Sequence, residues 1–114
     1  MILRGEIYRA RLDPVLGCEQ SGQRPVLIVQ NNVGNKYSPT VIALPITSRL
    51  TKSRLPTHVE ITAGACGLSK PSLILAEQVR TLDKQRLIEK LGRADAQTMS
   101  QVDFALRMSL QLND

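Results

Sequence analysis

Short apolar runs with strand-like spacing fill the first two thirds of the chain. Residues 7–12 alternate, with Tyr8, Ala10 and Leu12 on one face and two arginines on the other, which predicts a half-buried strand. Residues 26–30 are almost continuously apolar and predict a fully buried one. Further strands are predicted over residues 40–44, 57–61 and 73–79. Pro45, near the end of the third strand, predicts a sheet edge or a bulge there.

After residue 82 the spacing of apolar residues changes from the alternation of a strand to the spacing of a helix. Asp83 is a good N-cap for a short helix that ends at Gly92 and carries Leu87, Ile88 and Leu91 on one face. Asp95 can cap a longer final helix. The apolar stripe of that second helix is expected to contain Met99, Val102, Leu106 and Leu110.

The connections are rich in turn-forming residues, notably 31–35 and 64–71. Five short strands followed by helices predict one small α+β domain over residues 1–114 that is mostly β. We expect a strongly bent sheet or open barrel with the last helix packed against it.

Composition narrows the class of protein. At 114 residues and 42% apolar, the chain is long enough for one modest core, and no apolar run approaches the roughly 20 residues that a membrane span needs. It begins without the apolar segment of a signal peptide. Cys18 and Cys66 are far apart, and the chain has one histidine, so a zinc site or disulfide framework is not expected. These features favour a cytoplasmic protein that uses no metal and no cofactor.

The net charge is +5, with a pI near 9.7. This net positive charge favours a polyanionic partner, or an acidic protein that competes with such a partner. A net positive charge is also compatible with a protein that is merely soluble. Tryptophan is absent and aromatics are only 3%, which disfavours a single-strand binder built on stacking platforms. The basic segment 49–54 has no strand or helix period and is predicted to be an exposed loop, with simple solvation as the alternative role.

The stretch 17–25 is the strongest candidate for a site. Two glycines bracket a polar loop, and Arg24-Pro25 joins it to the buried strand that follows. Arg24 offers a planar fork of donors that fits a phosphate, although a structural arginine is the alternative. Thr47 and Ser48 offer hydroxyls at a strand end. The side chains suited to base edges or a ribose hydroxyl are Glu19, Gln20 and Gln78.

A nucleophilic pair of Cys18 and His58 is disfavoured, because no orienting third group is evident.

These residues resemble the MazF/PemK family of toxin endoribonucleases. The motif G-x-E-Q-x-G-x-R-P spans residues 17–25, and E-Q-x-R-T-x-D-K spans residues 77–84. Both occur in order and at the family's spacing, and agreement extends over nearly the whole chain. The other matching stretches are residues 4–8, 12–16, 26–27, 29–32, 38–40, 46–47 and 55–59.

The resemblance implies an SH3-like open β-barrel with a C-terminal helix (the CcdB/MazF-like fold), working as a homodimer. It implies metal-independent, sequence-specific cleavage of single-stranded RNA and neutralisation by a cognate acidic, MazE-like antitoxin. The family's catalytic Arg and Thr map onto Arg24 and Thr47. Its substrate contacts map onto Cys18, Glu19, Gln20 and Gln78, with Ser48 and His58 as further RNA-binding candidates. Cys18 departs from the usual serine, and a thiol is the weaker hydrogen-bonding group.

The chemistry that the resemblance implies is attack by the ribose 2′-oxygen on the adjacent phosphorus, leaving a 2′,3′-cyclic phosphate and a 5′-hydroxyl. Arg24 and Thr47 are expected to stabilise the charge on the phosphoryl oxygens. Arginine is a poor general base because it stays protonated, so Glu19 is the better candidate and His58 the second. Two other functions fit a basic domain of this fold: a non-catalytic nucleic-acid-binding module, and a gyrase-poisoning toxin of the CcdB type. The chain lacks the aromatic C-terminal tail of the latter.

Overall fold

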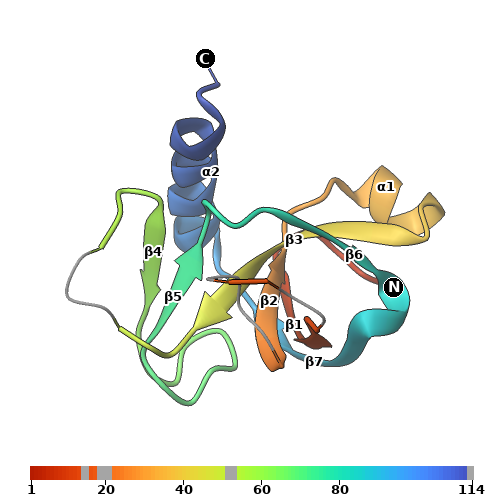
Figure 1. Ribbon diagram of the computed structural model, residues 1–114, viewed down its shortest axis with the longest axis horizontal. Coiled ribbons are helices and arrows are strands. Elements are labelled where there is room, and N and C mark those ends of the chain that lie inside the picture. The colour runs from red at the N-terminus through yellow and green to blue at the C-terminus, as the bar shows by residue number, and fades with distance from the viewer. Residues whose placement is uncertain (14–15, 18–21, 51–53, 113–114) are drawn as a thin grey trace.

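A computed structural model describes residues 1–13, 16–17, 22–50 and 54–112 (Figure 1). Within these residues the chain forms strands with one short and one long α-helix. In order, the elements are β1 (Glu6–Arg11), β2 (Gln23–Ile28), α1 (Asn32–Tyr37), β3 (Thr40–Thr47), β4 (His58–Ile61), β5 (Ser72–Leu75), β6 (Arg80–Asp83), the 3₁₀ turn η1 (Lys84–Arg86), β7 (Leu87–Arg93) and α2 (Ala96–Leu110).

The described strands form one strongly bent antiparallel sheet in the order β4-β5-β3-β2-β1-β7, with β6 also paired to β3. The sheet curls on itself without closing, and α2 stands beside β4 and β5 (Figure 1). The sequence predicted a mostly β, open-barrel domain with a C-terminal helix, and this prediction is confirmed. It predicted five strands, however, and the described residues contain seven. The predicted fifth strand, residues 73–79, ends at Leu75 as β5, and two further strands, β6 and β7, follow.

Strand β3 is central to the sheet. Its first half pairs with β6, through Thr40 to Ala43, and its end pairs with β5, through Ile46 and Thr47. Strand β2 pairs along the other edge, with Val26 opposite Pro45. The sheet edge or bulge predicted from Pro45 is therefore wrong, because β3 is paired on both sides and its register with β2 is regular at Pro45. The proline lies between the segments that pair with β6 and with β5, where a missing N–H interrupts neither ladder.

Two hydrophobic clusters pack on the two faces of this bent sheet. The first cluster is built around Ile7, Leu27, Leu44, Ile46, Val59, Ile61, Leu68, Ile74, Ala76, Ala94, Val102 and Ala105. The second cluster contains Ala10, Leu12, Val26, Ile28, Val41, Ala43 and Leu82. Neighbouring residues of β2 alternate between the clusters, because successive side chains of a strand point to opposite faces.

The short helix predicted after Asp83 is not formed. The Asp83 carboxylate does accept from the Gln85 N–H, at 2.8 Å, but it begins only the single 3₁₀ turn η1. The chain then extends as β7 and pairs with β1, Lys90 lying opposite Tyr8. Without β7, the outer edge of β1 would present a row of unpaired backbone groups. This long-range pairing outweighs the local helical pattern.

Helix α1 replaces the turn predicted over residues 31–35. Asn31 caps it, its side chain accepting from the Gly34 N–H at 2.8 Å. Asn35 is only 2% exposed, and its amide donates to the Gln30 carbonyl oxygen at 2.9 Å. A six-residue helix with a buried asparagine shows no apolar period, so the sequence pattern could not reveal it.

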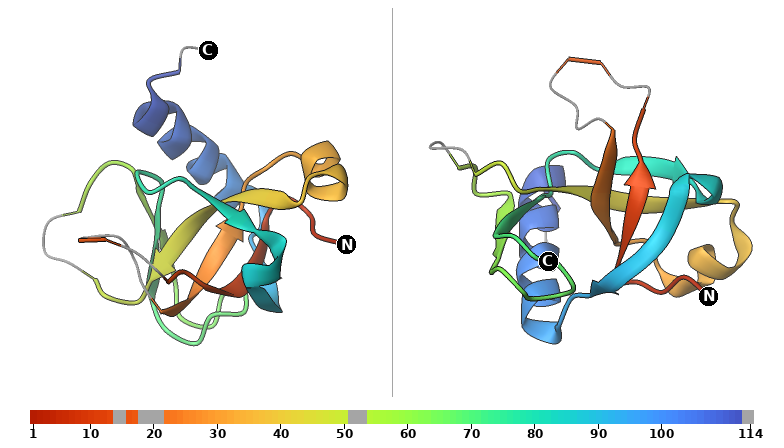
Figure 2. Two further views of the ribbon diagram at one scale, coloured as in Figure 1. Left: turned by 45° about the vertical axis from the view of Figure 1, so that its right-hand side comes forward. Right: turned by 90° about the horizontal axis from the view of Figure 1, so that it is seen from below.

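The long C-terminal helix is confirmed. The Asp95 carboxylate accepts from the Thr98 N–H at 2.7 Å, and hydrogen bonds from the Thr98 backbone and side chain hold the pKa of Asp95 below its usual value. Val102 and Ala105 are buried against the sheet, whereas Leu110 is 52% exposed, because the end of α2 projects beyond the sheet (Figures 1 and 2). Neither described helix has the length and apolar character that crossing a membrane requires.

The connector between β4 and β5 crosses β7 without room for side chains. A Cβ added to Gly67 would lie 2.0 Å from the Leu91 carbonyl oxygen, and one added to Gly92 would lie 2.3 Å from the Cys66 carbonyl oxygen. Leu68, the next residue, is buried in the first cluster. This close crossing fixes the connector against the barrel, and with it the residues that follow Leu68.

Candidate functional site

Arg24 and Thr47 come from neighbouring strands at one end of the sheet. The regular ladder between β2 and β3 ends at Val26 and Pro45, and extending its register by two residues brings Arg24 opposite Thr47. Arg24 also lies across from Ala10 of β1. Strand alternation puts Arg24 and Thr47 on the face that carries the second cluster, with directly opposed Cβ atoms typically about 5 Å apart. Arg24 belongs to β2 itself and not to the preceding loop.

Thr47 is 6% exposed, and its hydroxyl oxygen accepts from the Arg49 N–H at 3.1 Å. This bond anchors the start of the basic segment that follows β3. It also leaves the hydroxyl proton of Thr47 available for donation, since a hydroxyl has one proton and two acceptor positions. Arg49 and Arg54 are exposed and lie outside the described strands and helices, as predicted for residues 49–54; residues 51–53 lie outside the described chain.

Ser48 lies beside Arg24 in a small cavity of about 160 Å³. The first residues of β2 and the end of β3 form one side of it, and residues 68–72 form the other. Ile46 of β3 also lines the cavity, and Thr47, the next residue of the strand, points by alternation to the opposite face of the sheet. The Arg24–Thr47 pair and this cavity therefore lie on the two sides of the same strand ends, with Arg24 bordering both.

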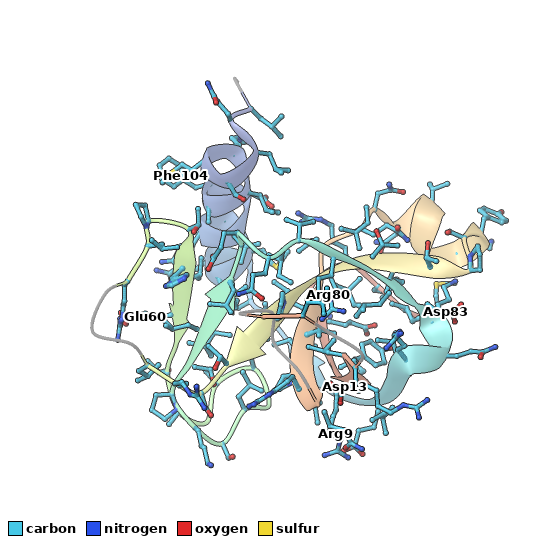
Figure 3. All side chains as sticks on the ribbon, in the orientation of Figure 1. Arg9, Asp13, Glu60, Arg80, Asp83 and Phe104 are labelled. Carbon is cyan, nitrogen blue, oxygen red and sulfur yellow. The ribbon has the colours of Figure 1, made fainter. Side chains whose placement is uncertain are left out.

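Two arginines hold the base of the β1–β2 connection. The Arg80 guanidinium donates to the Leu12 carbonyl oxygen at 3.2 Å, and Arg86 donates to the carbonyl oxygens of Arg11, at 3.2 Å, and of Asp13. The backbone closes the same region, since the Leu12 N–H donates to the Gly22 carbonyl oxygen at 2.9 Å. Figure 3 labels Arg80 and Asp13 among the side chains of this region. Cross-strand bonds thus fix both points from which the connection leaves the sheet.

The residues at the centre of that connection, Cys18, Glu19 and Gln20, lie outside the described residues. Their predicted contacts with RNA, and the role of Glu19 as general base, stay predictions. The structure describes the residues on either side, the end of β1 at Arg11 and the start of β2, where Arg24 lies.

His58 begins β4 and has both ring nitrogens occupied. Its Nδ1 accepts from the Leu55 N–H at 3.2 Å, which requires the proton to be on Nε2, and Nε2 lies 2.9 Å from the Glu77 carboxylate. The same carboxylate accepts from the Thr57 hydroxyl at 3.0 Å. This arrangement orders the end of the basic segment and disfavours His58 as the general base, because its acceptor nitrogen is already engaged.

Gln78 follows Glu77 in the turn between β5 and β6. Its N–H donates to the Leu75 carbonyl oxygen at 3.1 Å, and its side chain is half-buried. The hydrogen bond between His58 and Glu77 therefore ties the turn that carries Gln78 to the start of β4. Among the described residues, no group of three or more His, Cys, Asp or Glu side chains is placed to hold a metal ion.

Sequence reasoning missed several residues around these strand ends. Arg80 was part of a quoted motif, but its role in holding the Leu12 carbonyl depends on a contact 68 residues away. Arg86 was assigned to a helix that does not form. Ser69 and Lys70 were assigned to a connector, and only the folded structure brings them to the cavity beside Arg24.

Comparisons with known proteins show the family of the chain. Residues 3–110 match the family described as the PemK-like, MazF-like toxin of type II toxin–antitoxin system. The chain belongs to the PemK/MazF family. It is 51% identical to Endoribonuclease EndoA of Bacillus subtilis (strain 168), the alignment covering 100% of this chain and 98% of the relative.

Solved structures of the family have the same fold. An endoribonuclease in complex with its cognate antitoxin, from a mycobacterial species, superimposes with a TM-score of 0.82 at 31% identity, covering 100% of this chain and 99% of that one. MazF from Deinococcus radiodurans gives a TM-score of 0.82 at 31% identity, with 96% of each chain covered. Membership of the MazF/PemK family, suggested above by the two sequence motifs, is thereby confirmed.

Proposed function

We propose that this chain is the toxin of a type II toxin–antitoxin system and a sequence-specific, metal-independent endoribonuclease that cleaves single-stranded RNA. Family membership and the 51% identity to an endoribonuclease support the reaction class. The observation that supports the proposal at residue level is the β2–β3 register, which, extended by two residues beyond Val26 and Pro45, brings Arg24 opposite Thr47. The substrate class, cellular mRNA, assigns the activity to the cytoplasm.

The nucleophile in this reaction is the ribose 2′-oxygen of the substrate. It attacks the adjacent phosphorus, the bond to the 5′-oxygen of the next nucleotide breaks, and the products carry a 2′,3′-cyclic phosphate and a 5′-hydroxyl. Because nucleophile and electrophile belong to one molecule, the enzyme gains much of its rate by holding the backbone in line for attack. The Arg24 guanidinium binds two phosphoryl oxygens as their charge grows, and the Thr47 hydroxyl donates a further hydrogen bond.

Proton transfer needs a second group. A proton must leave the 2′-hydroxyl, and another must reach the departing 5′-oxygen. Arg24 remains protonated at working pH and serves as the electrostatic group. We assign the base role to Glu19. The engaged Nδ1 of His58 supports this choice over the histidine.

The partners follow from the same family relationship. The mycobacterial relative was solved with its cognate antitoxin, and a MazE–MazF complex of Deinococcus radiodurans covers 98% of this chain at 28% identity. We propose a cognate acidic, MazE-like antitoxin for this chain and a homodimer as its working form. The net charge of +5 suits both an acidic antitoxin and RNA, so the two are expected to compete.

The test uses the purified chain and a long mixed-sequence RNA in EDTA, with the 5′ ends of the products mapped by sequencing. We expect discrete ends that share one short word and accept a phosphate from polynucleotide kinase without prior dephosphorylation, because they carry a 5′-hydroxyl. Arg24→Ala serves as the matched inactive control. Intact RNA, or random ends that Arg24→Ala also produces, would refute the assignment.

A further inference from the structure

We propose that the cavity beside Arg24 is a binding site for a backbone phosphate of RNA next to the scissile one, with Lys70 as its charged ligand. The inference rests on the proposed function for its substrate class and adds a subsite and a residue to it. No family motif quoted above contains Ser69 or Lys70.

The cavity has the composition of an anion site. Its polar lining consists of Gln23, Arg24, Ser48, Ser69, Lys70 and Ser72, and none of the described residues around it is acidic. Two of these side chains are cations, and the hydroxyl groups of Ser48 and Ser69 can donate to phosphate oxygens. A volume of about 160 Å³ is large enough for a phosphate group and too small for a whole nucleotide.

The backbone that carries Lys70 is held in place from several directions. Leu68 is 6% exposed and packs in the first cluster, and its carbonyl oxygen accepts from the Gly64 N–H at 2.7 Å. The Ser72 hydroxyl, in a residue 5% exposed, donates to the Lys70 carbonyl oxygen at 2.9 Å. Gly67 fixes the same segment against β7. Lys70 is therefore an exposed cation on an ordered base, which reduces the entropy lost when a ligand binds.

The position of the cavity suits a strand of RNA that already contacts Arg24. Arg24 borders the cavity, while Thr47 faces the other side of the same strand ends. A backbone whose scissile phosphate lies against Arg24 and Thr47 can continue across the ends of β2 and β3, so that a neighbouring phosphate reaches Lys70 and Ser48. Lys70 then contributes affinity and register, and the reacting atoms stay with Arg24.

The variant pair Lys70→Gln and Lys36→Gln tests this site. Both remove one positive charge from an exposed lysine, but Lys36 lies on α1, over the ring of Tyr37 and away from the cavity. The probe is a fluorescent RNA with 2′-fluoro sugars, which lacks the nucleophilic 2′-oxygen, so that binding is measured without cleavage. Its affinity is measured over a series of salt concentrations.

For a single strand, each phosphate contact contributes about 0.7 to the slope of log K against log salt. We expect Lys70→Gln to lower that slope by about 0.7 and to weaken binding severalfold, while Lys36→Gln changes neither beyond the general charge effect. Lys70→Arg is expected to restore the slope. In cleavage assays on ordinary RNA, Lys70→Gln should raise KM and leave kcat within about twofold, because it removes binding and not transition-state stabilisation.

The outcomes separate this inference from the proposed function. Equal salt slopes of binding for Lys70→Gln and Lys36→Gln would overturn the Lys70 site. A Lys70→Gln variant that lowers kcat and leaves KM unchanged would overturn it as well. Failure of the wild type to bind the probe would overturn it too. If the wild type binds the probe with the Lys70-dependent slope but cleaves no RNA, the phosphate site stands and the nuclease assignment fails.

Discussion

The two hydrophobic clusters serve the molecule differently, although β3 and β2 contribute to both. The first cluster is covered by α2 through Val102 and Ala105 and is continuous with the tight crossing at Gly67. The described residues of the second cluster come from strands and their immediate ends, with no helix among them, and its open end carries Arg24, Thr47 and Arg80. Apolar burial thus holds the fold around the first cluster, and the charged groups lie at the strand ends beside the second cluster. Substitutions around the first cluster should therefore lower stability, whereas substitutions at the strand ends beside the second cluster should lower cleavage.

The largest effect on cleavage is expected from Arg24→Ala. Removing a preorganised donor to a developing oxyanion typically lowers kcat by about 10² to 10³. Cleavage of an RNA containing the mapped word, measured alongside the thermal midpoint, checks this. Arg93→Ala, an exposed arginine at the end of β7, is the matched control and should leave cleavage unchanged. A loss of less than about tenfold for Arg24→Ala would show that Arg24 is not the main electrostatic group.

The largest effect on stability is expected at the crossing beside the first cluster. Gly67 and Gly64 both have φ of +83°, but a Cβ at Gly64 meets nothing within 4 Å, whereas one at Gly67 meets the Leu91 carbonyl oxygen. Gly64→Ala should cost about 1 kcal/mol from backbone strain alone. Gly67→Ala should cost about 3 kcal/mol, because overpacking adds to that strain.

Denaturant unfolding of the two alanine variants measures this difference, and kcat of the folded fraction should be close to wild type in both. Similar unfolding free energies for Gly64→Ala and Gly67→Ala would show that the crossing can relax. A specific loss of kcat in Gly67→Ala would mean that the two ends of the sheet are coupled.

A smaller effect on cleavage is expected from Arg86→Met. The arginine donates to the Arg11 and Asp13 carbonyl oxygens and so holds the base of the connection that carries Glu19. A displacement of about 1 Å in a catalytic group can lower the rate about 100-fold, so we expect kcat to fall between about 10- and 100-fold. Single-turnover cleavage, with the enzyme in excess of both the RNA and Kd, measures it.

Arg86→Lys distinguishes positioning from direct catalysis, since it keeps one donor and should recover part of kcat. If Arg86 instead bound RNA, Arg86→Met would change the salt slope of binding more than kcat. That result would move Arg86 from the scaffold into the RNA interface.

The smallest expected effect is on stability at low pH, and it comes from Glu6, a buried carboxylate of the scaffold. It accepts from the Leu3 N–H at 2.8 Å, from the Tyr8 hydroxyl at 3.2 Å and from Lys90, at 2.5 Å. Burial alone raises the pKa of Glu6, but the bonds from Lys90, Leu3 and Tyr8 outweigh it, so the pKa lies below its usual value of 4.5. The same burial and the charge of Glu6 raise the pKa of Tyr8.

A lowered pKa in the folded state fixes the sign of the pH dependence. The stabilising contribution of ionised Glu6 is complete above pH 4.5 and is lost as the pH falls through the folded-state pKa. Unfolding free energies between about pH 6 and about pH 3 should therefore fall less steeply for Glu6→Gln than for wild type. Parallel curves would show that the Glu6 network does not depend on ionisation. Cleavage at neutral pH should be unaffected, because Glu6 lies at the far end of β1 from Arg24.

The sequence by itself determined the features that depend on neighbouring residues. The capped final helix after Asp95, the alternating β1 and the buried β2 all follow from local spacing, as did the family motif around Arg24. These features persist because caps and amphipathic patterns act within one or two turns or along one strand.

The tertiary structure alone decided the features that depend on distant partners. Residues 87–93 became a strand because β1 needed an edge partner, and Pro45 is tolerated inside the sheet because β3 changes partners there. Likewise, Arg80 and Arg86 find backbone carbonyls more than 60 residues away, and Lys70 reaches the side of Arg24 because Leu68 and Gly67 anchor its segment. The physical reason is common to all of these: unpaired backbone groups and buried surface are satisfied by the whole fold, and no local spacing records which distant residue will satisfy them.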